Sequence, residues 1–225
     1  MAAPVAYDES TFQKAWDAFL QHIPVLFAVW AAGLLVTLVG VVVFVAILIA
    51  VGAAANGNEA VVGVASITGQ LAQLPFSILS SLIGVLMVAV PAIYYETGDV
   101  VTVEGAFQHL TARFRRYVLA GLFFSLLTSL GVVFCVLPGI AIALVMPVYV
   151  NRIFVTDLSI GDAFSQSFQT VYRSEDGLAF VGLEILTGLL VVVLTLLTCG
   201  LAAVVAVPMG SFVLQKSAYQ RGLLR

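Results

Sequence analysis

The sequence predicts an all-α integral membrane protein, with six transmembrane helices in three hairpins, each preceded by a cytoplasmic interfacial amphipathic helix. Of the 225 residues, 62% are hydrophobic and 9% are charged, and the mean hydropathy is +1.14. A soluble domain carries about 25% charged residues, so this chain cannot cover itself with a solvated surface. The other two observations are the lengths of the uncharged segments and the placement of Lys and Arg around them.

The long apolar stretches set the number of predicted spans. They cover residues 23–58, 60–95, 117–151 and 177–215, and their one charge is Glu184. A bilayer core of about 30 Å needs roughly 20 helical residues. The first two stretches are therefore predicted to hold one span each, joined by a polar loop at residues 53–63. As straight helices the last two would measure about 55 Å, which is too long for one span and enough for two short ones.

Charge placement decides in favour of six spans. With six spans, all nine Lys and Arg residues fall on one side of the membrane, which the positive-inside rule assigns to the cytoplasm together with both termini. With single crossings in the last two stretches, Arg113 and Arg152 would lie on opposite sides. Tight outer corners are therefore predicted at residues 137–139 (Leu-Pro-Gly) and 198–200 (Thr-Cys-Gly). Proline suits the start of a helix, where its missing N–H would have no partner.

A short segment with helical periodicity precedes each predicted hairpin, at residues 11–23, 103–117 and 160–172. Apolar residues recur there at i, i+3, i+4 and i+7, as in an amphipathic helix. The apolar face of the first segment consists of Phe12, Trp16, Phe19, Leu20 and Ile23. Ser159 and Asp162 predict a capping box. Aromatic side chains favour the headgroup level of a membrane. The predicted interfacial anchors are Trp16, Phe107, Phe164 and Phe168.

These segments share a dipeptide of alanine and an aromatic residue, which indicates an internal repeat. The dipeptides are Ala15-Trp16, Ala106-Phe107 and Ala163-Phe164. The predicted repeat units are residues 9–96, 101–157 and 158–220, within a single membrane domain covering residues 1–225. The second and third units also share a spacing, from Gly139 to Pro147 and from Gly200 to Pro208. Repeats with an even number of spans keep one orientation, so a pseudo-threefold axis along the membrane normal is expected.

Two segments of the C-terminal two-thirds support a family resemblance. They are "LPGIAIALVMPVYV" (residues 137–150) and "DLSIGDAFSQSFQTVYRSEDGL" (residues 157–178). The chain resembles a broad group of uncharacterised bacterial six-span membrane proteins, which includes the membrane domain of some glycerophosphodiester phosphodiesterases. This resemblance implies a bacterial inner-membrane protein and no catalytic residues in this chain.

Glu184 and the two cysteines are candidate site residues with two interpretations each. A carboxylate at the centre of a bilayer costs about 2.5 kcal/mol or more. Glu184 is therefore either a proton, cation or ligand site facing the bundle interior, or an acid near the headgroups or hydrogen-bonded to another helix. Cys135 and Cys199 both fall at predicted outer corners. They either form a disulfide in an oxidising compartment or act as small apolar residues.

Arg113, Arg115 and Arg116 form a basic cluster beside a predicted span. Such a cluster can contact anionic lipid, although membrane topology alone would also place it there. His22 and His109 are interpreted as polar residues at the headgroup level rather than as catalytic bases. No metal site is predicted, because the cysteines and the histidines fall on opposite sides of the membrane.

The sequence predicts no enzyme and no cofactor, because it contains no nucleophile–base pair, phosphate-binding loop or HExxH motif. Its scattered basic residues also predict no nucleic acid partner. The leading interpretation is a non-enzymatic accessory or scaffold subunit of an inner-membrane assembly, in contact with lipids and with other subunits or copies of itself. The alternatives are a small-molecule or ion channel or transporter with Glu184 lining a central cavity, and a lipid-handling membrane protein.

Overall fold

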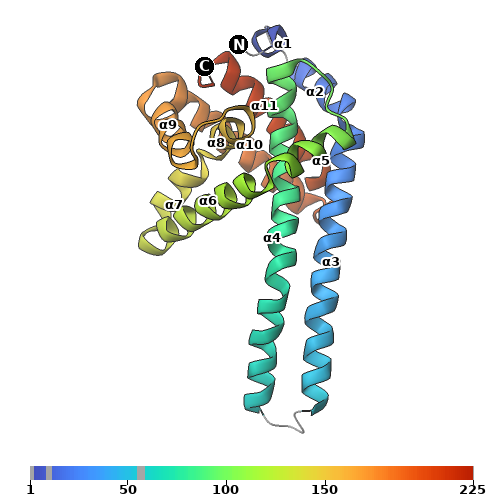
Figure 1. Cartoon of the computed structure of the whole chain (residues 1–225). Helices are drawn as coiled ribbons and strands as arrows, with labels where there is room; N and C mark the ends of the chain where they lie inside the picture. The colour runs from blue at the N-terminus through green and yellow to red at the C-terminus, as the bar shows by residue number, and fades with distance from the viewer. Residues whose placement is uncertain (1–2, 9–11, 55–58, 225) are drawn as a thin grey trace. The chain divides into compact units, whose positions relative to one another are not determined.

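The computed structural model describes residues 3–8, 12–54 and 59–224, and helix is the only regular secondary structure in these residues (Figure 1). The helices are α1 (Pro4–Tyr7), α2 (Phe12–Gln21), α3 (Ile23–Ala54), α4 (Glu59–Thr97), α5 (Val103–Ala112), α6 (Phe114–Phe134), α7 (Val136–Ala143), α8 (Met146–Val155), α9 (Ile160–Arg173), α10 (Glu175–Leu197) and α11 (Ala203–Gln220). Residues 55–58 of the predicted first outer loop, and the basic residue Arg225, lie outside the described residues.

Four of these helices, α3, α4, α6 and α10, are long and apolar enough to cross a membrane. Helices α7 and α8 together meet the same test but are bent by 41° at the break between them, so the described residues hold four candidate spans, or five with the bent pair. These helices indicate a membrane protein. The predicted sixth span corresponds to α11, which ends in the polar segment "QKSAYQ" and is not one of the candidates. Six spans therefore stay a prediction.

The chain divides into two compact units, Ala28–Gly84 and the remainder. The smaller unit is an antiparallel pair formed by most of α3 and α4. A side chain at Gly40 would lie 2.8 Å from Phe76, and one at Gly69 would lie 2.7 Å from Phe44, so each phenylalanine fills the notch left by a glycine. The hydroxyls of Thr37 and Ser80 also share a 2.8 Å hydrogen bond between the two helices. The first predicted repeat unit contributes residues to both compact units.

The short helices α2, α5 and α9 occur in the larger unit where the periodicity predicts them. The alanine of each repeated dipeptide is buried, with Ala15 at 3% exposure and Ala106 and Ala163 at 0%. Ser159 also caps α9 as predicted, because its hydroxyl accepts a 3.1 Å hydrogen bond from the Asp162 amide. The location of these helices in a membrane interface stays a prediction.

The predicted apolar face of α2 and the face that packs on the rest of the chain share Phe19 but otherwise differ. Phe12, Leu20 and Ile23 are exposed, whereas Ala15, Ala18 and Phe19 are buried. The alanines let α2 pack closely on α11, where the ring of Phe19 meets the ring of Phe212 edge to face. Two alanines and one phenylalanine therefore form the contact surface of this helix.

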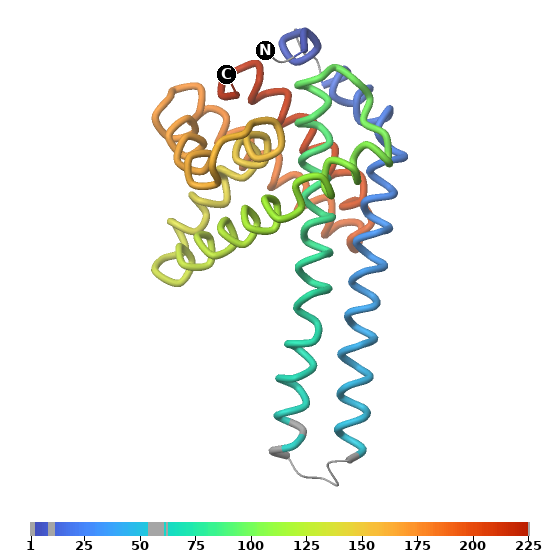
Figure 2. Tube along the Cα trace, viewed as in Figure 1, coloured from blue at the N-terminus to red at the C-terminus, as the bar shows by residue number. Residues whose placement is uncertain are grey.

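The first predicted corner in the larger unit is narrower than expected and lies at Cys135, just before residues 137–139. The chain reverses at Cys135, whose backbone is extended (φ −171°, ψ 141°), and residues 137–139 form the first turn of α7. Helix α7 runs back along α6. Figure 2 shows the two helices where the colour changes from green to yellow. The two helices touch through backbone, because a side chain at Gly131 would lie 2.9 Å from the Cα of Gly139. The second corner occupies residues 198–202, with left-handed backbone at Cys199 (φ 51°) and Gly200 (φ 94°).

Candidate functional site

Glu184 lies near the middle of α10 and is half-buried. Its Oε2 atom is buried and has no hydrogen-bond partner among the described residues. Tyr172 of α9 is close enough to sense its charge: burial raises the pKa of the Tyr172 hydroxyl, and the Glu184 carboxylate raises it further. Glu184 therefore faces neighbouring helices of its own unit, and the proton or ligand site stays a prediction.

Tyr172 also holds the break between α7 and α8. In an unbroken helix the Val145 amide would donate to the Ala141 carbonyl. Here it donates to Ile142 instead, at 3.1 Å, and the Tyr172 hydroxyl donates to Ala141 at 2.7 Å. Pro147 lies in the first turn of α8, where a missing N–H is tolerated. The bend is thus stabilised by a side chain from α9, and Glu184 of α10 lies near that side chain.

A buried polar cluster, which sequence reasoning missed, connects the ends of α4, α8 and α11. It consists of Glu96, Asn151, Gln215 and Tyr219. Asn151 donates to the Gln215 side chain at 3.1 Å and to the Tyr219 hydroxyl at 2.9 Å, and that hydroxyl donates to Glu96 at 2.8 Å. Gln215 donates in turn to the Pro147 carbonyl at 2.8 Å. Satisfied buried networks of this kind fix one arrangement of the helices that contribute to them.

One sequence signal could have identified this cluster. An amide residue directly precedes a basic residue near the end of two apolar stretches, at Asn151-Arg152 and at Gln215-Lys216. All four of these residues are at most 8% exposed. Sequence reasoning used the basic residues only to assign topology, so the amides beside them were overlooked.

His22 is fully buried within the chain, so its side chain does not itself contact lipid headgroups, and its depth in a membrane stays a prediction. Its Nδ1 atom is 2.7 Å from the Ala18 carbonyl, and its Nε2 atom accepts a 3.1 Å hydrogen bond from the Val101 amide. The ring also contacts Tyr94 and Phe212. Burial lowers the pKa of His22, with only partial opposition from the Ala18 carbonyl. The neutral imidazole therefore joins the end of α2 to the loop before α5.

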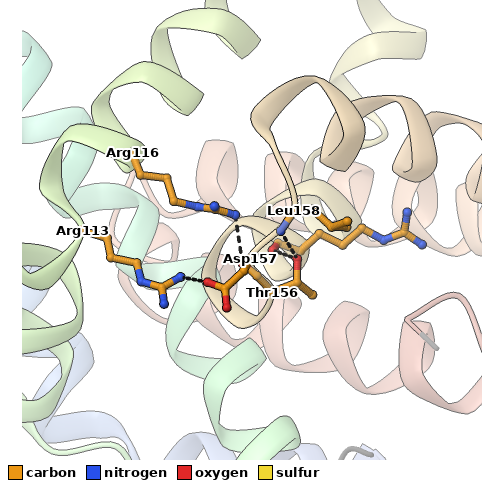
Figure 3. A network of polar contacts seen from close by, with 6 residues as sticks. Arg113, Arg116, Thr156, Asp157 and Leu158 are labelled. Atoms are coloured by element: carbon orange, nitrogen blue, oxygen red, sulfur yellow. Dashed lines mark hydrogen bonds and ion pairs between the residues drawn. The ribbon is translucent and has the colours of Figure 1, made fainter.

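The three arginines predicted to contact anionic lipid have different surroundings. Arg113 pairs with Asp157, and Arg116 donates to the Thr156 carbonyl at 2.9 Å, so both reach the loop between α8 and α9 (Figure 3). Arg115 is exposed. Two of the three guanidinium groups therefore hold two segments of the chain together, and lipid contact by the cluster stays a prediction.

The predicted aromatic anchors also differ in burial. Phe164 is half-buried and packs against the rings of Phe123, Phe124 and Tyr149, which ties α9 to α6 and α8. Phe168 is 36% exposed. Trp16 and Phe107 are half-buried. Anchoring in a membrane interface stays a prediction for all four residues.

Cys135 and Cys199 are exposed free thiols in this structure, one at each corner of the larger unit. A disulfide between them stays a prediction for an oxidising compartment. Within the described part of the chain, no group of three or more His, Cys, Asp or Glu side chains is arranged to hold a metal ion.

Comparison of the chain with protein-family models, with curated proteins and with solved structures gives no match. The resemblance to six-span bacterial membrane proteins therefore stays a prediction, and function is argued from the geometry alone.

Proposed function

We propose that this chain is a non-enzymatic accessory or scaffold subunit of a larger assembly in a bacterial inner membrane. The observation that carries the proposal is the apolar surface of α10. Only 6% of its most apolar segment is buried by the rest of the chain, and its exposed side chains include Leu186, Leu189 and Leu190. Such a surface requires lipid or partner helices to cover it.

The interior of the larger unit also suits a scaffold. The buried polar cluster has its hydrogen bonds satisfied within the chain, and aromatic rings pack around His22 and Phe212. A satisfied polar interior leaves the exposed apolar surface as the part of the chain that would contact partners.

The proposed topology has six crossings with both termini in the cytoplasm. Support comes from α11, because a side chain at Gly210 would lie 3.1 Å from Thr187 of α10. From the corner at residues 198–202, α11 therefore runs back along α10 for about half the length of that helix. Reporter fusions after Thr97, Thr156 and Leu224 test this topology. All three should be cytoplasmic, and a periplasmic reporter at any of them would contradict it.

A photoreactive residue tests the scaffold role directly. Placed at Leu190 in cells that express the protein at native abundance, it should form a discrete crosslink to another membrane protein. The same protein should co-purify at constant stoichiometry. The matched control is Phe180, which lies on the same helix but is fully buried and should give no such crosslink. Lipid adducts alone, from a chain that always purifies by itself, would refute the scaffold role.

A second function, proton or cation transport, is favoured by one observation. An unpartnered Glu184 oxygen lies near a broken helix pair, and broken helices often form ion sites in transporters. In proteoliposomes, Glu184→Gln should abolish a proton or cation flux that Glu175→Gln, a change at the exposed start of α10, leaves intact. Absence of flux in the unchanged protein, or equal flux in both variants, would remove this function.

A further inference from the structure

Arg152 is the most deeply buried arginine among the described residues, at 8% exposure. It projects from the last turn of α8. Its Nη2 atom donates to the Thr170 hydroxyl at 3.0 Å and to the Leu223 carbonyl at 3.2 Å. Its Nη1 atom is buried and has no partner. The guanidinium group is therefore held in place by two neutral acceptors, while one of its nitrogens has none.

Among the described residues of α8, α9 and the C-terminal turn, no carboxylate pairs with Arg152. Helix α8 contains no Asp or Glu, and neither do residues 217–224. Helix α9 contains only Asp162, which interacts with Ser159 at the opposite end of the helix from Thr170. The ion pairs between described residues join Lys14 to Asp8 and Arg113 to Asp157, so Arg152 belongs to neither.

A buried guanidinium group without a counter-ion is strongly unfavourable. Arginine stays protonated in proteins, so it cannot avoid the penalty by losing its proton as a lysine can. Breaking a buried ion pair is costly for the same reason, because the remaining charge is left uncompensated. An anion that accepts hydrogen bonds from Nη1 would supply both the missing acceptor and the missing charge.

The location of Arg152 indicates the kind of anion. The bent candidate span formed by α7 and α8 ends at Val155, three residues after Arg152, and lipid phosphates lie at the ends of membrane-crossing helices. Arg173 lies three residues after Thr170 and shares its side of α9, and the nearest acids along the chain, Glu175 and Asp176, are exposed at the start of α10. Guanidinium groups match phosphate oxygens in geometry and charge.

We propose that Arg152 is the centre of a phosphate-binding site between α8, α9 and the C-terminal turn, with the headgroup of an anionic phospholipid as its ligand. The Thr170 hydroxyl and the Leu223 carbonyl orient the guanidinium group. The phosphate accepts hydrogen bonds from Nη1. This site is separate from the Arg113, Arg115 and Arg116 cluster, and it does not depend on the scaffold role.

Thermal unfolding in a neutral detergent tests the site. Added phosphatidylglycerol should raise the Tm of the unchanged protein by about 3 °C or more, because a ligand of the folded state stabilises it by mass action. Phosphatidylcholine, whose headgroup has no net charge, should not. Inorganic phosphate separates the two sources of the anion. If inorganic phosphate raises the Tm as much as phosphatidylglycerol does, the phosphate-binding site is confirmed and its ligand is free phosphate.

Substitutions test whether the Tm shift caused by phosphatidylglycerol depends on the Arg152 side chain. Arg152→Met should remove the Tm shift, and Arg152→Lys should reduce it, because lysine keeps the charge but loses the planar fork. Lys14→Met, at an exposed basic residue of α2 outside both arginine sites, should leave the shift unchanged. An equal shift in the Arg152→Met protein would overturn the proposal.

Native mass spectrometry of the unchanged protein covers the case in which the variants do not fold. One anionic phospholipid should remain bound per chain after purification, and phosphatidylcholine should not replace it. Protein that carries no anionic lipid, and whose Tm responds to neither phosphatidylglycerol nor phosphate, would refute the site.

Discussion

The α6–α7 and α10–α11 hairpins share a sequence pattern but are built differently. In each, a glycine near the corner is followed eight residues later by a proline, at Gly139 and Pro147 and at Gly200 and Pro208. In the first hairpin the corner is the single residue Cys135, and the chain bends again before Pro147. In the second, the corner takes residues 198–202, and Pro208 lies inside the continuous helix α11.

The difference follows from where each glycine falls. Gly139 lies beyond its corner, inside α7, and meets the backbone of α6. Gly200 lies in the corner itself, at φ 94°, with open space around its Cα. The first glycine is therefore required by space and the second by backbone conformation. The same residue type at matching positions of a shared sequence pattern can meet two different physical demands.

The largest expected effect is at Gly139. Gly139→Asn should lower the free energy of unfolding by about 3 kcal/mol, because any side chain there would lie 2.8 Å from the Val132 amide nitrogen and force α6 and α7 apart. The measurement is unfolding in mixed micelles. The matched change Gly200→Asn should cost less than about 0.5 kcal/mol, since asparagine tolerates left-handed backbone. An equal loss in the free energy of unfolding for both variants would show that the two glycines are required for the same physical reason.

The next largest effect is expected at His22, which belongs to neither hairpin. It tests whether the stability of the two hairpins depends on the rest of the larger unit. His22→Phe should cost about 2 kcal/mol, because it leaves the buried Val101 amide without an acceptor. Hydrogen exchange should be faster at Val101 and unchanged at Gly131 and Thr198, in the two hairpins. Faster exchange in a hairpin would show that the hairpins depend on His22.

Acid should act through the same histidine. Its folded-state pKa is lowered by burial, so the unfolded chain binds the extra proton first as pH falls. The stability that neutral His22 contributes is fully present above its unfolded pKa of about 6.5 and decreases between that pH and the lower folded pKa. Unfolding curves measured over this range should show the decrease in the unchanged protein and not in His22→Phe. A decrease of the same size in both would assign it to another group.

A smaller effect is expected for Gly200→Ala. There is room for a methyl group, so the cost of about 1 kcal/mol comes only from left-handed backbone at an alanine. The control is Gly188→Ala, in the neighbouring helix α10, where there is also open space. That change should be neutral or stabilising because alanine favours helix. A cost at both positions would indicate crowding rather than conformation, and unfolding in mixed micelles distinguishes the two.

The smallest effect has the opposite sign. Cys199 has a φ of 51°, a conformation that costs a non-glycine residue energy, so Cys199→Gly should raise the free energy of unfolding by about 0.5–1 kcal/mol. Cys135→Gly should not stabilise the protein, because Cys135 is extended. The comparison is made under reducing conditions. Under oxidising conditions a loss of stability in Cys199→Gly, together with one missing disulfide in a thiol count, would support the predicted bridge.

Local patterns in the sequence predicted the positions of α2, α5 and α9 and the cap at Ser159, because periodicity and capping depend on neighbouring residues. The register of the first corner was not predictable, since Pro138 is equally acceptable in a turn and in the first turn of α7. The amides of the polar cluster had a signal in the basic residues that follow them, but their pairing did not. The pairing of Asn151 with Gln215 depends on the meeting of α8 and α11, and nothing in either segment alone specifies its partner.

The buried face of α2 shows a further limit. Hydrophobicity placed Phe12, Leu20 and Ile23 on the apolar face of an interfacial helix, whereas the side that packs within the chain contains Ala15 and Ala18. In a membrane protein a large apolar side chain is as stable in lipid as in the interior, so hydrophobicity does not identify the packed side of a helix. The small residues of the repeated dipeptide were the better guide to helix contacts.

The length of α3 has a consequence for the surrounding bilayer. Its apolar part, Ile23–Ala53, is about 46 Å long at 1.5 Å per residue, whereas a hydrocarbon core is about 30 Å thick. A helix with this mismatch tilts, or the lipids around it stretch. We expect the tilt of α3 to decrease as acyl chains lengthen, so the protein should partition toward the thicker regions of a membrane.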